Sequence, residues 1–341
     1  MRRRAIAFAL LSAALFGAST PLAKILLGST SPLLLAGLLY LGAGLGLAAW
    51  LALRGGFKTV ARGDLPWLAA AVAAGGIAAP ALLMFGLART DGATASLLLN
   101  LEAVFTAAIA WIAFRENVDR RVFAGMVAIV AGGAVLSFQA TPHLGSGTLL
   151  IAAACFAWAL DNNFTRRISG GDAATLACVK GLVAGSVNLA LALIQGAYLP
   201  APGFLAIAGI VGLLGYGVSL ALFIVALRDL GTARTAAYFS VAPFFGAALA
   251  LLVLGETAGW SLWVAALLMA LGVGLHISER HRHAHRHEPL AHEHEHVHDE
   301  HHRHEHAFPW DGREPHAHPH QHGPLAHTHP HHPDLHHRHR H

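Results

Sequence analysis

The sequence predicts an all-α integral membrane protein with ten transmembrane helices, arranged as two inverted five-helix repeats and followed by a disordered, histidine-rich tail. Three observations support this fold class. The 341 residues are 55% hydrophobic and only 12% charged, which is too apolar for an ordinary soluble domain. Apolar runs of about 20 residues recur along the chain up to residue 278. Of the 26 histidines, only His143 and His276 precede residue 281.

Each apolar run is long enough to cross a membrane as a helix. A helix rises about 1.5 Å per residue, so about 20 residues cross a hydrocarbon core about 30 Å thick. The connectors are short and contain turn residues, as in "GSTSP" and "LPAPG". The predicted spans are residues 5–27, 32–53, 66–88, 93–114, 121–140, 148–166, 173–198, 203–227, 232–254 and 258–278. These spans divide the chain into a first repeat (1–140), a second repeat (141–279) and a tail (280–341).

The first run begins like a secretory signal, with three arginines, an apolar stretch and small residues. The apolar stretch continues to Leu27 with only Lys24 interrupting it, which is enough to span a bilayer. We therefore expect an uncleaved first transmembrane helix.

The basic residues of the predicted loops fall mainly on one side of the membrane. Thirteen Lys or Arg residues lie on that side, whereas only Lys24 and Arg89 lie near helix ends on the other side. Cytoplasmic loops carry the excess of positive charge. We therefore expect a multi-pass protein of the cell inner (plasma) membrane with both termini in the cytoplasm. Its expected partners are membrane lipid and a small-molecule or ion substrate, not nucleic acid, and its oligomeric state stays open.

Two segments indicate an internal repeat. "AVFTAAIAWIAFRE" (103–116) and "PFFGAALALLVLGE" (243–256) align at a shift of 140 with five identities in fourteen, including Glu116 with Glu256. Because each half has five spans, an odd number, the second half must insert upside down relative to the first. Inverted repeats are typical of secondary transporters with a site near the membrane midplane. The spans contain no HExxH or Ser/His/Asp arrangement, so we expect a transporter and not an enzyme.

The segments "LLLNLEAVFTAAIAWIAFRE" (97–116) and "APFFGAALALLVLGE" (242–256) resemble the EamA domains of the drug/metabolite transporter superfamily. The resemblance covers roughly residues 5–278 and both copies. It implies efflux or exchange of amino acids, metabolites or drugs, usually without ATP. Ala103 stands where family members often carry proline, whereas the second copy keeps Pro243. Any helix break at this position is therefore expected to be asymmetric.

Glu102 lies near the middle of the fourth predicted span, with Asn100 two residues before it. Ionisable side chains at bilayer depth are costly unless they are paired or hydrated, so each is a functional candidate. A carboxylate here suits proton coupling or cation binding. The structural alternative is a Glu that pairs with Lys24 or Lys180 to hold helices together.

The stretch "DNNFTRR" places Asp161, Asn162 and Asn163 one to two turns inside the cytoplasmic end of the sixth span. Three consecutive polar residues occupy most of a helix circumference, so at least one faces the interior or a neighbouring helix. They are candidates for substrate binding at the inner mouth. The alternative is a set of interhelical hydrogen bonds.

The seventh span carries Lys180 and Asn188, which are eight residues apart and close to the same helix face. A lone ammonium at that depth needs a carboxylate or water, so Lys180 either lines the substrate cavity or forms a structural ion pair. Lys24 completes the candidate substrate-binding set, although its place near an outer helix end also lets it snorkel to the interface.

The tail contains its own repeat. Residues 287–306 and 322–341 align at a shift of 35 with 13 identities in 20. The segment has almost no apolar surface and much proline, so we expect it to be disordered. Neutral imidazoles bind Ni, Co, Zn and Cu ions. The candidate metal ligands are His292, His294, His296, His298, His301, His302, His304, His306, His327, His329, His331, His336, His337, His339 and His341.

The sequence thus favours a secondary transporter of a small metabolite, with no required cofactor and with a tail that serves as a metal regulator or buffer. The alternative is a transporter of Ni, Co or Zn itself, for which the tail acts as a cytoplasmic chelator. A solvated tail that gains charge below about pH 6.5 also fits the composition.

Overall fold

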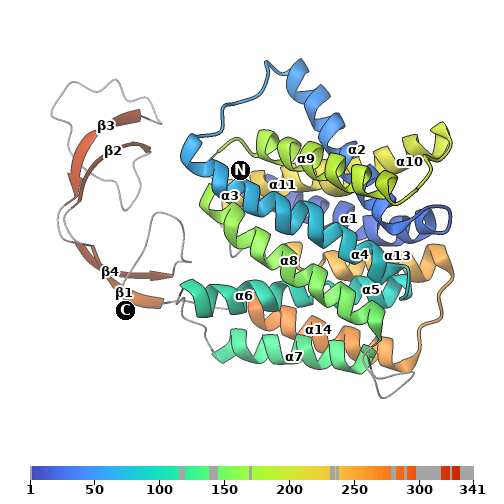
Figure 1. Cartoon of the computed structure of the whole chain (residues 1–341). Coiled ribbons are helices and arrows are strands. Elements are labelled where there is room, and N and C mark those ends of the chain that lie inside the picture. Colours follow the sequence, from blue (N-terminus) through green and yellow to red (C-terminus); the bar gives the residue numbers. More distant parts are fainter. Residues whose placement is uncertain are drawn as a thin grey trace. The chain divides into compact units, whose positions relative to one another are not determined.

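The computed structural model describes residues 2–114, 120–137, 145–168, 171–230, 235 and 238–277, together with four segments of the tail. The chain forms two compact units, Met1–Glu279 and Arg280–His341, and each is described by itself (Figure 1).

The first unit is a bundle of helices (Figure 1). The helical elements of its first half are α1 (Arg2–Leu27), α2 (Pro32–Leu53), η1 (Arg62–Asp64), α3 (Leu65–Ala71), η2 (Val72–Ala78), α4 (Ala79–Leu87), α5 (Gly92–Leu98), α6 (Leu101–Phe114) and α7 (Arg120–Ser137). Those of its second half are α8 (Ser146–Ile168), α9 (Ala173–Ile194), α10 (Pro202–Gly212), η3 (Leu213–Val218), α11 (Ser219–Leu230), α13 (Ala242–Leu254) and α14 (Trp260–Ile277).

Helical segments lie within each of the ten predicted spans. By length and composition, six helices of the described part can cross a membrane, which makes the bundle a multi-pass membrane unit. Their bounds are Arg4–Leu27, Pro32–Leu53, Arg62–Leu87, Gly92–Ile109, Ala173–Ile194 and Pro202–Ala226, and two shorter apolar helices cover Ala242–Leu254 and Trp260–Leu275. The number ten stays a prediction.

Local sequence signals set where several helices begin. Ser31 accepts a hydrogen bond from the Leu34 N–H and is followed by Pro32 in the first turn of α2. Asp91 accepts from Thr94 N–H at the start of α5 over 2.7 Å. Such side chains satisfy N–H groups that have no partner inside the helix.

Two helices contain a π-helical turn at corresponding places. The turn η2 joins α3 to α4, and η3 joins α10 to α11. Val72 and Leu213, at which they begin, are 141 residues apart. A π-helical turn shifts the hydrogen-bonding pattern of the helix and occurs often at functional sites.

Both halves also break the helix that carries the repeated EamA-like segment. In the first half α5 ends at Leu98 and α6 begins at Leu101. In the second half α13 begins at Ala242, directly after a turn at residues 240–241. The expectation of an asymmetric break was therefore wrong. At the break in the first half the Asn100 side-chain amide donates to Leu97 O, a local bond that competes with helical bonding.

Glycine allows close helix contacts between the two halves of the chain. Some of these contacts come in pairs, in which the glycine of one contact lies in the first half and the glycine of the other lies at the corresponding position of the second half. Gly44 of α2 lies against Leu182 of α9, and Gly185 of α9 lies against Leu41 of α2. A shift of 141 carries Gly44 onto Gly185 and Leu41 onto Leu182, so the second contact is the first with the two halves exchanged. Small residues let membrane helices pack backbone to backbone.

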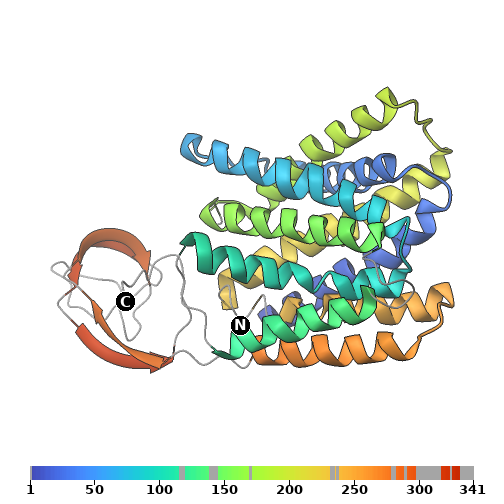
Figure 2. The same cartoon turned by 60° about the horizontal axis from the view of Figure 1, so that its bottom comes forward.

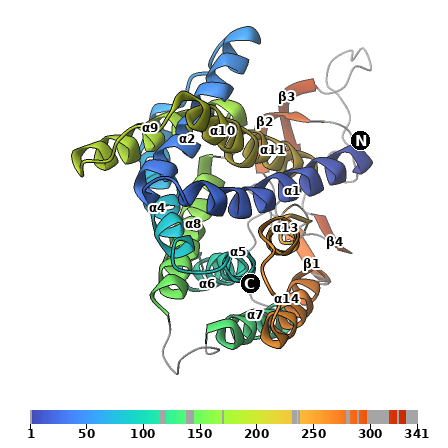
Figure 3. The ribbon, with the colours of Figure 1, turned by 90° about the vertical axis from the view of Figure 1, so that its right-hand side faces the viewer.

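The same exchange relates α7 and α14, which run side by side (Figure 2). Gly132 of α7 packs on Met269, whereas Gly272 of α14 packs on Ile129. Here the shift is 140. Helix α13 packs against both α1 and α5 (Figure 3).

The described residues of the second unit form four strands in two antiparallel ladders. Strand β1 (Arg282–His287) pairs with β4 (Leu325–Pro330), and β2 (Leu290–His296) pairs with β3 (His316–His322). The disorder expected of residues 280–341 stays a prediction. The histidines of the four strands alternate with other residues, which is the period of a strand.

Candidate functional site

A buried ion pair lies at the centre of the candidate site. The Lys180 ammonium on α9 is 2.6 Å from both carboxylate oxygens of Asp161 on α8. Each side chain is only 8% exposed. The Thr165 hydroxyl, one turn further along α8, donates to Asp161 Oδ1 over 2.8 Å. The two charges satisfy one another inside an apolar bundle, where either one alone would be costly.

The carboxylate of Asp161 lies directly against the backbone of the π-helical turn η2. A Cβ atom at Gly75 would collide with the Asp161 carboxylate. The Gly75 carbonyl accepts hydrogen bonds from the Tyr40 hydroxyl at 2.9 Å and from the Trp158 indole N–H at 3.0 Å. The Asn188 amide donates to a second carbonyl of this turn, Ile77 O, over 3.2 Å. Side chains from α2, α8 and α9 thus hold the carbonyl groups of η2.

Glu102 joins this region through Asn162. The Asn162 amide donates to Glu102 Oε1 over 2.7 Å. Because Asn162 directly follows Asp161 on α8, the second carboxylate lies close enough to interact with the charges of Asp161 and Lys180. The Glu102 side chain is half-buried and Asn162 is exposed. The structural alternative for Glu102 is therefore corrected, since its partner is an amide and not Lys24 or Lys180.

Four aromatic rings line the neighbouring interior. Phe16 meets Trp158 and Tyr216 edge to face, with ring centroids 6.0 and 5.9 Å apart. Tyr40 lies 5.3 Å from Tyr216 in a tilted arrangement. These rings come from α1, α2, α8 and η3, so both halves of the chain contribute. The site thus combines an apolar aromatic wall with a charge pair.

Three other predicted site residues make contacts of a different kind. Asn100 is 2% exposed and donates to Leu97 O at the helix break. Asn163 is buried and donates to Ala159 O within its own helix. The Lys24 ammonium donates to Leu87 O and Thr90 O, at the C-terminal end of α4, about three turns from Gly75.

Sequence reasoning missed Phe16, Tyr40, Gly75, Trp158 and Tyr216 as parts of this region. The paired glycines "GG" at residues 75–76 were a signal, because adjacent glycines inside an apolar helix indicate close approach of another group. The aromatic residues gave no such signal, since one aromatic ring in an apolar span looks like another.

A separate hollow of about 250 Å³ lies at loop ends, between residues 58–64 and 168–176. It shares no residue with the ion-pair region. The Lys58 N–H donates to the Thr175 hydroxyl there, and Asp172 accepts from Thr175 N–H at the start of α9.

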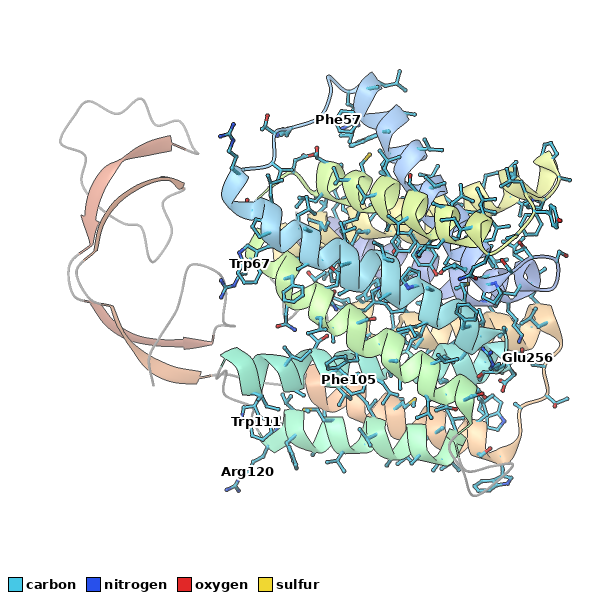
Figure 4. All side chains as sticks on the ribbon, viewed as in Figure 1. Phe57, Trp67, Phe105, Trp111, Arg120 and Glu256 are labelled. Carbon is cyan, nitrogen blue, oxygen red and sulfur yellow. The ribbon has the colours of Figure 1, made fainter. Side chains whose placement is uncertain are left out.

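A carboxylate at one end of the bundle joins the second half of the chain to the first. Figure 4 places Glu256 at the opposite end from Trp67, Trp111 and Arg120. Glu256 accepts hydrogen bonds from the N–H groups of Gly92 and Ala93, at 2.6 and 2.8 Å, and so ties the loop after α13 to α5.

The predicted tail ligands divide between strands and other segments. The backbone of β2 contains His292, His294 and His296, and that of β4 contains His327 and His329. The others lie outside the described residues: His298, His301, His302, His304, His306, His331, His336, His337, His339 and His341.

Comparison with known proteins gives one family and several relatives. The model of the EamA-like transporter family matches twice, at residues 3–138 and 145–278. A Methanothermobacter thermautotrophicus protein described as an "uncharacterized transporter" is 30% identical over 205 residues, which is 58% of this chain and 60% of that protein. A Salmonella typhimurium protein described as a "probable amino-acid metabolite efflux pump" is 31% identical over 204 residues, covering 54% of this chain and 66% of that protein.

The matched region thus spans somewhat less than two thirds of either relative's length. A solved crystal structure resembles 80% of this chain and 95% of its own with a TM-score of 0.61 at 18% sequence identity, a likeness of fold alone.

Proposed function

The chain belongs to the EamA-like transporter family, and from this premise we propose that it is a secondary transporter that exports or exchanges a small charged metabolite by alternating access. The observation that carries the proposal is the buried Lys180–Asp161 pair beside the π-helical turn. Ionisable groups at bilayer depth mark substrate and ion pathways in membrane proteins.

Alternating access needs two related halves, and several observations support an inverted repeat. The family model matches each half separately. The contact of Gly44 with Leu182 recurs with the halves exchanged as the contact of Gly185 with Leu41. The π-helical turns and helix breaks also lie at corresponding places. In such transporters two rocking halves expose one central site to each side in turn.

The chemistry of the site favours a substrate that carries both an amino and a carboxyl group. A substrate carboxylate would take the place of Asp161 at the Lys180 ammonium, and a substrate amine would take the place of Lys180 at Asp161. This exchange leaves no buried charge without a partner, which would otherwise be costly. The aromatic rings of Tyr40 and Tyr216 offer apolar contact beside it. The Salmonella relative described as a probable amino-acid metabolite efflux pump supports this class.

Glu102 is the proposed coupling group. Its carboxylate is half-buried, accepts from Asn162 and lies next to the Asp161–Lys180 pair. Carboxylates in this position carry protons or cations in pumps and transporters. Loading and unloading of Glu102 would change the charge beside Asp161 and so link the substrate to the coupling ion.

We assign the tail a regulatory or buffering role through transition-metal binding. The competing function is transport of the metal itself, and 24 histidines beyond residue 280 are the observation that favours it. The site in the bundle supports the metabolite instead, because its pair offers one carboxylate that is already bound by an ammonium.

The distribution of basic residues supports an inner-membrane protein with both termini in the cytoplasm.

Flux in inside-out vesicles tests these functions. Radiolabelled amino acids, zinc, nickel and cobalt would be compared for the full chain, for a chain that ends at Ser278 and for Asp161→Asn. We expect amino-acid flux in both chains and none in Asp161→Asn. Metal flux that disappears in Asp161→Asn, without amino-acid flux in any chain, would contradict the metabolite proposal.

A further inference from the structure

The contact between Asp161 and the π-helical turn η2 has a counterpart in the other half of the chain. A Cβ atom at Gly75 of η2 would collide with Asp161, and a Cβ atom at Gly215 of η3 would collide with Ser19 of α1. A shift of 142 carries Ser19 onto Asp161, and a shift of 140 carries Gly75 onto Gly215. The two contacts therefore correspond to one another. Where the second half places a carboxylate, the first half places a hydroxyl.

Two side-chain donors that hold η2 have no equivalent at η3. The Gly75 carbonyl accepts from the Tyr40 hydroxyl and from the Trp158 indole N–H. A shift of 141 places Gly181 at the position that corresponds to Tyr40, and a shift of 142 places Phe16 at the position that corresponds to Trp158. Neither of these side chains carries a hydrogen-bond donor. The two turns thus differ in their polar surroundings.

The turn η3 brings a polar group of its own into the bundle, the Tyr216 hydroxyl. Tyr216 directly follows Gly215 and is 8% exposed, and its hydroxyl makes no hydrogen bond within the described part of the bundle. The Ser19 side chain is close enough to affect this hydroxyl, but it gives its own proton to Phe16 O over 2.6 Å. A buried hydroxyl without a partner is costly. The Tyr216 hydroxyl therefore points to a ligand as its partner.

Tyr216 lies one aromatic ring away from the ion pair. Its ring centroid is 5.3 Å from that of Tyr40. The Tyr40 hydroxyl in turn reaches the Gly75 carbonyl, against which Asp161 lies. A substrate whose amino and carboxyl groups exchange with Asp161 and Lys180 would thus extend its side chain along Tyr40 toward Tyr216.

We propose that Tyr216 and Ser19, beside Gly215, form a side-chain subsite that binds an uncharged hydrogen-bonding group of the substrate. This inference rests on the proposed function and narrows the substrate to amino acids whose side chain carries a hydroxyl or an amide. Tyr216 is the specificity-determining residue, because a phenol hydroxyl both donates and accepts. A charged side chain fits poorly, since Ser19 offers no opposite charge and a buried charge without a partner is costly.

Counterflow of amino acids with matched shapes tests the assignment. Threonine and valine differ in a hydroxyl group, and asparagine and leucine differ in an amide group that reaches further. The initial rate of counterflow of each would be measured in proteoliposomes for the unchanged chain, for Tyr216→Phe and for Tyr198→Phe. The last variant is the matched control, because it removes the same hydroxyl from a side chain that is 92% exposed.

Tyr216→Phe should lower the rate ratio of threonine to valine, or of asparagine to leucine, by at least about fivefold. The reason is that the polar group of the substrate is then buried without a partner. Tyr198→Phe should change neither ratio by more than about twofold. Unchanged ratios in Tyr216→Phe, or an equal loss of rate for all four amino acids, would overturn the proposal.

Thermal unfolding separates a role in specificity from a role in packing. Tyr216→Phe should unfold at the same temperature as the unchanged chain or at a higher one, because the hydroxyl that it removes has no partner within the described bundle. A lowered unfolding temperature together with unchanged rate ratios would show that the hydroxyl serves packing, and would overturn the subsite.

Failure of the subsite and failure of the proposed function are distinguishable. Counterflow of amino acids with ratios that Tyr216→Phe leaves unchanged would overturn the subsite and leave the transport proposal standing. Absence of counterflow of all four amino acids in the unchanged chain would overturn amino-acid transport and the subsite with it.

Discussion

Asp161→Asn should leave Lys180 as a buried ammonium without a carboxylate. The two groups are joined by contacts of 2.6 Å to both oxygens, and each side chain is 8% exposed, so water screens the pair weakly. Removing one partner of a buried pair destabilises a protein by about 3–5 kcal/mol. The single variant should therefore unfold at a lower temperature in detergent and lose transport.

Replacing both charges separates structure from function. The double variant Asp161→Leu with Lys180→Met removes the desolvation cost of both ions, and such changes are neutral or stabilising by about 1–4 kcal/mol. We expect its thermal stability to match or exceed that of the unchanged chain. Transport should stay absent, because a charged substrate has no partner to exchange with.

The assay combines thermal unfolding in detergent with amino-acid uptake into proteoliposomes. Asp64→Asn is the matched control, since Asp64 ends the short helical turn η1 before α3 and its side chain caps no N–H of α3. A double variant that is both stable and active would refute the reasoning, because the ion pair would then be a packing device only.

Four further predictions follow from particular contacts. Gly75→Ala should abolish transport, since a Cβ there collides with the Asp161 carboxylate, whereas Gly203→Ala, which has open space, should be silent in the same uptake assay. Glu102→Gln should retain substrate exchange between the two sides but lose accumulation against a gradient, measured with and without an imposed pH difference; unchanged accumulation would remove Glu102 from coupling. Glu256→Ala should cost about 0.5–2 kcal/mol of stability in thermal unfolding, because two N–H groups of α5 lose their acceptor. Zinc binding by the tail should weaken as pH falls through about 6.5, because protonated imidazole is no ligand; pH-independent affinity would contradict histidine ligation.

Much of the fold could be predicted from the sequence because a membrane-spanning helix needs a long apolar run. Helical segments lie within every predicted run. The π-helical turn at Val72–Ala78 could not be predicted, because it depends on acceptors and donors from other helices: Tyr40, Trp158 and Asn188 hold its carbonyl groups.

The residues of the candidate site could be selected one by one from the sequence, but their contacts with one another could not. Asp161 and Lys180 each stood out because a charge inside an apolar span is unusual, yet their pairing joins α8 to α9 and needs the tertiary structure. Glu102 was placed with the wrong structural partners for the same reason, since its partner Asn162 lies 60 residues away. Lys24, also predicted as a site residue, donates to backbone carbonyls at the end of α4, and this contact too needs the tertiary structure.

For the tail, the composition and the spacing of the histidines indicate different structures. Its composition indicates that it cannot build an apolar core, and this argument predicted disorder. The alternation of histidine with other residues in "LAHEHEH" has the period of a strand, but a period alone does not say which segment pairs with which. The register of His292 with His320 comes from the structure.

Solute counterflow in proteoliposomes tests the central claim most directly. Liposomes that contain the purified chain are preloaded with an unlabelled amino acid and diluted into a trace of the same amino acid carrying a radiolabel, without ATP. An alternating-access exporter predicts a transient accumulation of label inside that is absent in Asp161→Asn. Absence of accumulation for every amino acid tested, together with counterflow of zinc or nickel, would contradict the account.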